Sequence, residues 1–132
     1  MTGESDLRAL LSGMRPELNP GRYVFSFVTG GVPEGLAPVV TVTEPEGLTL
    51  VVPEEAADAA GLAYDYVAGW ITLRAHSALD AVGLTASVSQ ALADAGLSCN
   101  VVAGFHHDHL FVPHEHAARA VNLLEELSRS TV

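Results

Sequence analysis

Apolar residues recur at intervals of three and four in several segments of the chain, which is the spacing of one buried helix face. This pattern predicts a short helix over residues 5–14, with Ser5 as the expected N-cap. It also predicts helices over residues 83–95, ended by Gly96, and from Pro113 onward. The residues expected on the inner faces are Leu7, Leu10, Leu11 and Met14, then Leu84, Val88, Ala91, Leu92 and Ala95, and finally Ala117, Val121, Leu124 and Leu127.

Alternating and β-branched residues predict strands between these helices. Residues 22–28 form one expected strand, with Tyr23, Phe25 and Phe27 on one face. Residues 16–21 are expected to end the first helix, and the glycine- and proline-rich segment 29–38 is an expected loop. Pro53 is expected to begin a further helix that ends near Ala60. The other expected strands are 39–43 and 48–52, which form a hairpin, a short strand at 63–67, and strands at 69–75, 97–103 and 107–112.

One strand-to-helix junction occurs twice. Leu50–Glu55 and Leu110–Glu115 both end a strand, pass through a proline and begin a helix with a glutamate, 60 residues apart. The repeat favours an α+β protein of two related halves, residues 1–67 and 68–132. The second half has the order β-α-β-β-α, which is a ferredoxin-like unit without its closing strand. That strand must come from the first half or from a second chain.

The charge balance excludes several classes of partner. Sixteen acidic residues against six basic ones give a net charge of -10. Such a surface repels phosphate backbones and anionic headgroups, so nucleic acid and membrane are not expected partners. No apolar run is long enough for a membrane span, and no basic and apolar leader begins the chain, so a cytoplasmic protein is expected. The lone Cys99 excludes an internal disulfide framework and a cysteine-rich zinc site.

The segment between the expected strand 69–75 and the helix 83–95 carries a candidate ligand site. Asp80 can pair with an ammonium group, and Gly83 lets a ligand approach the backbone closely. The N–H groups at the start of the helix can hold a carboxylate. These groups together suit a zwitterion, although Asp80 can also serve only as a cap of the turn or helix.

The same residues carry a family resemblance. The pattern Asp80-x-x-Gly83-Leu84, a helix of about a dozen residues, and then Ala95-Gly96-Leu97-Ser98 resembles the ACT domain, a regulatory module of aspartokinases and phosphoglycerate dehydrogenase. The ending His107–Val112 is similar to a hairpin of the paired ACT modules in cytosolic arginine sensors. Val82 stands where the family often has proline.

The resemblance implies an α+β protein with the ferredoxin-like βαββαβ ACT fold, in which two ACT-like halves pack together. It also implies an amino-acid sensor with no catalytic activity and no cofactor. The ligand carboxylate would bind backbone N–H groups around Val82, Gly83, Leu84 and Thr85. Its ammonium group would lie near Asp80, Ser98 and Asn100. A homodimer is expected, because ACT sheets tend to pair side by side.

Two other functions stay open at this stage. In the cluster His106–His109, the imidazoles of His107 and His109 occupy alternate strand positions and could bind zinc or nickel, in a metal-binding protein or a metal-dependent enzyme. The cluster could equally form a pH-responsive surface. Cys99 could pair with these histidines as a nucleophile, but its alternation with Leu97 and Val101 predicts a small core residue. The third function is an interaction domain without a ligand.

Overall fold

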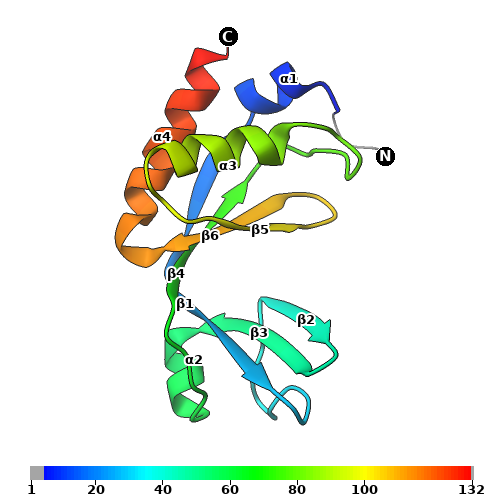
Figure 1. Cartoon of the computed structure of the whole chain (residues 1–132), viewed down its shortest axis with the longest axis vertical. Coiled ribbons are helices and arrows are strands. Elements are labelled where there is room, and N and C mark those ends of the chain that lie inside the picture. Colours follow the sequence, from blue (N-terminus) through cyan, green and yellow to red (C-terminus); the bar gives the residue numbers. More distant parts are fainter. Residues whose placement is uncertain (1–4, 132) are drawn as a thin grey trace. The chain divides into compact units, whose positions relative to one another are not determined.

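Residues 5–131 are described by a computed structural model, which contains both helices and strands (Figure 1). Within these residues, one unit comprises the chain up to Pro20 and from Gly69 onward, and the other is Gly21–Ala68. The strands follow the hydrogen-bonded order β2-β3-β1-β4-β6-β5. The elements are α1 (Leu7–Ser12), β1 (Pro16–Val28), β2 (Val40–Glu44), β3 (Gly47–Pro53), α2 (Glu54–Ala59), β4 (Val67–Leu73), α3 (Leu84–Asp94), β5 (Asn100–Ala103), β6 (Asp108–Pro113), a 3-10 turn (His114–His116) and α4 (Ala117–Ser130).

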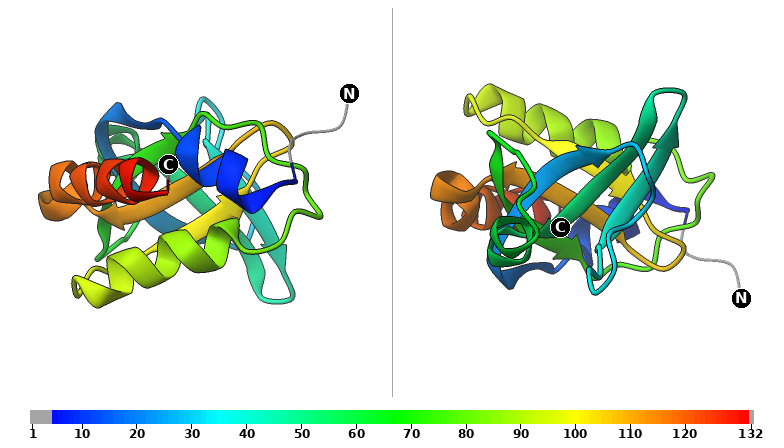
Figure 2. Two further views of the ribbon diagram at one scale, coloured as in Figure 1. Left: turned by 90° about the horizontal axis from the view of Figure 1, so that it is seen from above. Right: turned by 90° about the horizontal axis from the view of Figure 1, so that it is seen from below.

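The first unit has the ferredoxin-like strand order β1-β4-β6-β5. Strands β5 and β6 form an antiparallel hairpin, in which Asn100 lies opposite Phe111 and Ala103 opposite Asp108. Helices α1, α3 and α4 contact one another and lie over one face of this sheet (Figure 2). The closing strand that the second half of the sequence lacks is therefore β1, which comes from the first half of the chain.

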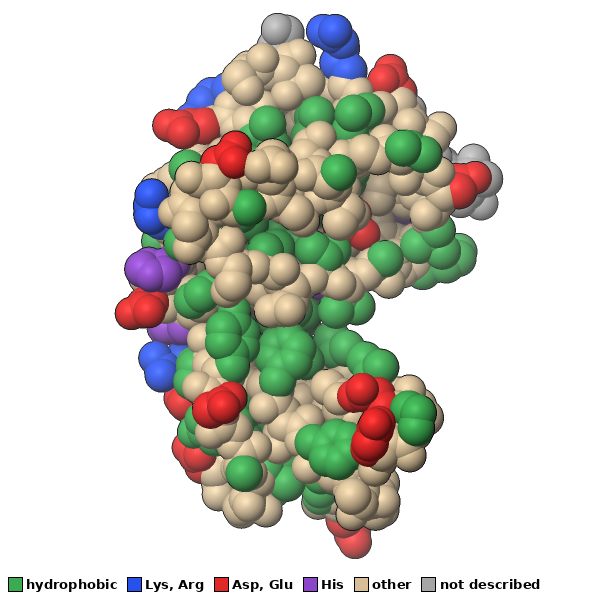
Figure 3. Space-filling view, viewed as in Figure 1, with side chains coloured by type: hydrophobic (Ala, Val, Ile, Leu, Met, Phe, Trp, Pro, Cys, Tyr) green, Lys and Arg blue, Asp and Glu red, His purple; other side chains and the backbone are tan. Residues whose placement is uncertain are grey.

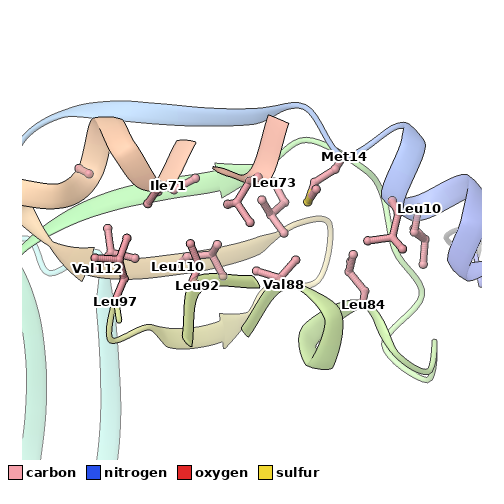
Figure 4. Close-up of a cluster of buried hydrophobic side chains, with 14 residues drawn as sticks. Leu10, Met14, Ile71, Leu73, Leu84, Val88, Leu92, Leu97, Leu110 and Val112 are labelled. Atoms are coloured by element: carbon pink, nitrogen blue, oxygen red, sulfur yellow. The ribbon is translucent and has the colours of Figure 1, made fainter. Parts of the chain in front are cut away.

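The core of this unit lies between the three helices and the sheet (Figure 4). Helix α3 places Leu84, Val88 and Leu92 in it, as the sequence pattern predicts. Strand β4 contributes Ile71 and Leu73, which alternate along the strand and so share its helix-facing side. The other buried members are Leu10, Leu11, Met14, Leu97, Leu110, Val112, Ala117, Ala120 and Leu124.

The second unit is a smaller sheet with one helix. Strand β3 pairs antiparallel with both β1 and β2, so the predicted hairpin is confirmed. Helix α2 contacts β3, and Ala57 of the helix joins the buried residues Val24, Leu50 and Val52. The unit has no helix between β1 and β2; residues 29–39 form an extended loop there, and Leu36 of this loop packs against the cluster.

Some predicted boundaries are wrong, each for a local reason. Residues 16–21 were expected to form a break but belong to β1. Strand β3 pairs with β1 only from Tyr23 onward, so Pro16 and Pro20 have a neighbouring strand on one side only, where a strand tolerates proline. Residues 63–66 form no strand, and β4 ends at Leu73 instead of Ala75. Strand β5 begins at Asn100 instead of Leu97. The N-cap of α1 is Asp6, whose carboxylate accepts a hydrogen bond from the Arg8 N–H at 3.1 Å.

Candidate functional site

The predicted ligand loop joins β4 to α3 in the first unit. Gly83 is the N-cap of α3 and has a φ of +103°, a left-handed conformation that favours glycine. It has no side chain with which to cap the first N–H groups of the helix. The Cδ2 of Leu7 in α1 lies 3.0 Å from where a Cβ of residue 83 would stand, so α1 covers one side of this glycine.

Three predicted site residues on this loop are exposed and one is buried. Asp80, Val82 and Thr85 have exposed side chains, and Asp80 lies within a turn in which the Ala81 N–H donates to the Ala78 carbonyl at 3.0 Å. The side chain of Leu84 is in the core, so only its backbone can face a ligand. The loop therefore offers a carboxylate to solvent, and no side-chain cap at residue 83 bonds the first N–H groups of α3.

The structure does not bring Ser98 and Asn100 to this loop. Both follow the far end of α3, which has eleven residues and is about 16 Å long. In Figure 4, Leu84 and Leu97 lie at opposite ends of the core. A single amino acid is much shorter than α3, so within one chain it cannot contact Gly83 and Asn100 together.

Three histidines gather beside the candidate loop. The rings of His76 and His106 are 5.2 Å apart between centroids, and His107 lies 6.4 Å from His76 and 6.3 Å from His106. The sequence alone does not place His76 in this cluster. The strand order brings it there. Strands β4 and β6 are antiparallel neighbours, so the end of β4, which precedes His76, lies beside the start of β6, which follows His106 and His107. The Nδ1 atom of His107 is buried and has no hydrogen-bond partner among the described residues.

The neighbouring carboxylate of Asp108 is also buried. The Ser77 hydroxyl donates to its Oδ2 at 3.5 Å. Burial raises the pKa of Asp108, although this hydrogen bond and the nearby charges of His109 and His107 oppose the rise. Asp108 is thus a weaker acid than an exposed aspartate, and it directly follows His106 and His107 in the chain.

His109 belongs to a different set of contacts. Its Nδ1 accepts a hydrogen bond from the Trp70 indole N–H at 3.1 Å and lies 3.2 Å from the Thr72 hydroxyl. The Asn19 amide donates to that hydroxyl at 2.9 Å. An indole nitrogen can only donate, so the ring nitrogen that accepts from it carries no proton. The structure thus holds His109 neutral in a partly buried polar network.

The metal hypothesis gains no ligand set from these positions. His109 bonds Trp70, whereas the ring of His107 lies among His76 and His106. Between residues 5 and 131, no group of three or more His, Cys, Asp or Glu side chains is arranged to hold a metal ion.

Cys99 packs against the core, as its alternation with apolar residues predicts. Burial raises the pKa of its thiol to about 11. Because the thiolate is the nucleophilic form, the thiol is unreactive near neutral pH. This environment disfavours the nucleophile interpretation.

The state of His109 predicts a pH dependence of stability. Burial lowers the pKa of His109, the charges of His107 and Arg74 lower it further, and only Asp108 opposes them. As the pH decreases below the ordinary value of 6.5, the unfolded chain therefore binds a proton at His109 that the folded chain does not bind. The free energy of unfolding should decrease as the pH decreases. Urea denaturation between about pH 5.5 and 7.5 should show a shallower fall in His109→Gln than in the parent chain. The same substitution in the 3-10 turn after β6, His116→Gln, is the control, and equal slopes in the parent and His109→Gln would contradict the assignment.

Comparisons with known proteins agree on the fold. Two sequence models of the ACT domain match residues 2–69 and 66–126. A crystal structure of a Vibrio cholerae protein of unknown function, described as a possible transport protein, is 47% identical, with a TM-score of 0.84 over 92% of this chain and 95% of that one. The regulatory subunit of aspartate kinase from Thermus thermophilus, in a ligand-free form, is 12% identical, with a TM-score of 0.62 over 87% of this chain and 97% of that one. A search of curated proteins found no significant match.

The architecture defines an α+β protein with one six-stranded sheet, in which β1, β4, β6 and β5 follow the ferredoxin-like order. The chain belongs to the ACT domain family, since a family model matches more than half of its length. ACT domains are regulatory modules that typically bind small molecules such as amino acids. No helix among residues 5–131 is both long and apolar enough to cross a membrane.

Proposed function

We propose that this protein is an amino-acid sensor with no catalytic activity of its own. The observation that supports this most directly is that two models of the ACT domain match the chain, one over residues 2–69 and one over residues 66–126. The chain also covers nearly all of the aspartate kinase regulatory subunit, a protein that is itself a regulatory component. The sensor would act in the cytoplasm on a partner of its own.

The proposed ligand site is the loop from Asp80 to Thr85. The ligand carboxylate would accept hydrogen bonds from the N–H groups of residues 82–85, where the positive end of the α3 dipole favours an anion. The exposed carboxylate of Asp80 would pair with the ligand ammonium group. Leu7 covers Gly83 on the α1 side, so the ligand would approach from the opposite side of the loop.

Ser98 and Asn100 would enter the site from a second copy of the chain. The length of α3 separates them from Gly83 of their own chain, but in a homodimer the β5 start of one protomer can face the loop of its partner. A ligand bound across such a contact would stabilise one arrangement of the dimer over another. This difference in affinity is what allows a small molecule to regulate a partner.

The substitution Asp80→Ala tests the site. Calorimetric titration of the parent chain with each of the twenty amino acids should identify one or a few binders. Asp80→Ala should weaken their binding about tenfold or more, because an ammonium group loses its counter-charge. Asp80 is exposed, so this variant should unfold at the same temperature as the parent.

The matched control is Asp65→Asn, which changes an exposed aspartate in the second unit and should leave amino-acid binding intact. Light scattering with and without the ligand would report the expected change in the dimer. The proposal fails if no amino acid binds, or if Asp80→Ala binds the same ligand as tightly as the parent chain.

An interaction domain without a ligand remains the second candidate. It is favoured by three large apolar side chains on the loops beside the histidines, since Leu79, Val82 and Phe105 are 66%, 82% and 72% exposed. Exposed apolar groups in one region mark surfaces that partners cover. The same titrations separate the two candidates, because this one predicts no amino-acid binder at all.

A further inference from the structure

A pocket lies in the Gly21–Ala68 unit, away from the candidate loop in sequence. It is open to solvent, has a volume of about 530 Å³, and is lined by Phe25, Ser26, Phe27, Thr49, Ala63, Tyr64 and Asp65. It forms where residues 63–65 pass beside β1 without joining the sheet. A pocket of this volume can hold a small organic molecule.

Contacts with residues that do not line the pocket hold two of its side chains, Phe27 and Tyr64, in place. A Cβ on Gly47 would stand 2.6 Å from the Cζ of Phe27, so the Phe27 ring packs directly on the backbone of the β2–β3 turn. Phe27 is nevertheless 46% exposed. On the other side, the Tyr64 hydroxyl is bound to the Asp58 carboxylate at 2.8 Å and to Glu54 at 3.2 Å. Two aromatic side chains are thus presented to solvent in fixed positions.

The hydroxyl groups of the pocket have no proton left for a ligand. The Ser26 hydroxyl donates to the Ala63 carbonyl at 2.8 Å, and the Thr49 hydroxyl donates to the Glu44 carboxylate. The Tyr64 hydroxyl donates to its two carboxylates, whose proximity raises the pKa of Tyr64 to about 12, together with burial. A ligand carboxylate would therefore find no hydroxyl donor among these side chains.

The charge of the unit favours a cation instead. Residues 21–68 contain seven acidic residues and a single arginine, Arg22, whose Nε already bonds Glu54 at 2.7 Å. Figure 3 shows acidic and hydrophobic side chains next to one another on the exposed surface of this unit. Asp65, at the edge of the pocket, is exposed and has no hydrogen bond or ion pair among the described residues.

From these contacts we infer that the pocket binds a small aromatic or branched apolar amine as its cation. The apolar part packs against Phe25 and Phe27, and the ammonium group pairs with Asp65. An ammonium group near an aromatic face gains a further cation–π attraction. A free amino acid is disfavoured here, because its carboxylate lacks donors and meets a negative field. The pocket is thus a second site, and its existence does not depend on the proposed sensor site.

Three probes of one shape test this inference on the full chain: 2-phenylethylammonium, the uncharged 2-phenylethanol and the anion 3-phenylpropionate. Titration followed by NMR should show the amine binding at least several-fold more tightly than the alcohol, and the anion not binding. Asp65→Asn should weaken the amine about five- to tenfold and leave the alcohol unchanged. Phe27→Leu, which keeps an apolar side chain, should weaken both the amine and the alcohol.

Asp80→Ala is the control for this site and should bind the amine like the parent chain. The inference is overturned if none of the probes binds, if the amine and the anion bind equally, or if Asp65→Asn keeps the parent affinity for the amine. None of these outcomes changes what the amino-acid titrations are expected to show, so either proposal can fail while the other holds.

Discussion

Leu92→Ala is expected to lower the free energy of unfolding by about 2–5 kcal/mol, one of the two largest effects that we predict. Leu92 is fully buried on α3, in the cluster between that helix and the sheet (Figure 4). Truncation removes apolar surface from the core and leaves a cavity that the surrounding helices can fill only in part. Urea denaturation should show a lower midpoint with an unchanged slope.

Leu79→Ala provides the matched control. It removes the same atoms from a side chain that is 66% exposed, so the free energy of unfolding should change by less than about 0.5 kcal/mol. Similar losses in the two variants would show that Leu92 does not pack as the structure has it.

Gly69→Ala is expected to cost about 1–3 kcal/mol although it adds only one carbon atom. A Cβ at residue 69 would stand 2.6 Å from the Cβ of Ala117, at the start of α4. Real Cβ atoms are essentially never this close, so β4 and α4 must move apart and lose packing between them. Thermal or urea denaturation of the variant would measure the loss.

Two further variants make this prediction specific. Gly30→Ala adds a methyl group in open space and should leave the stability almost unchanged. Combining Gly69→Ala with Ala117→Gly should recover part of the loss, because the second change removes the atom that the first one meets. A loss that is the same with or without Ala117 would contradict the close approach of these two elements.

The predicted site illustrates which parts of a fold are visible in a sequence. Asp80 and Gly83 were placed on one strand-to-helix loop because they are neighbours along the chain, and the structure keeps them there. Ser98 and Asn100 were grouped with them through the family pattern, but α3 carries the chain to the other end of the sheet before they occur. His76 was overlooked since its neighbour His106 is thirty residues away in the chain.

What the sequence determined by itself is the local structure: the inner faces of α3 and α4, the β2–β3 hairpin, the strand-proline-helix repeat and, through short motifs, the family. These features depend on residues within a few positions of one another, so their periodicity and turn chemistry are sufficient. The tertiary structure alone decided that β1 closes the sheet beside β4, which histidines meet, and where the pocket lined by Phe25 and Phe27 opens. Such pairings join segments far apart in the chain, and they depend on which arrangement buries the most apolar surface while satisfying the backbone hydrogen bonds.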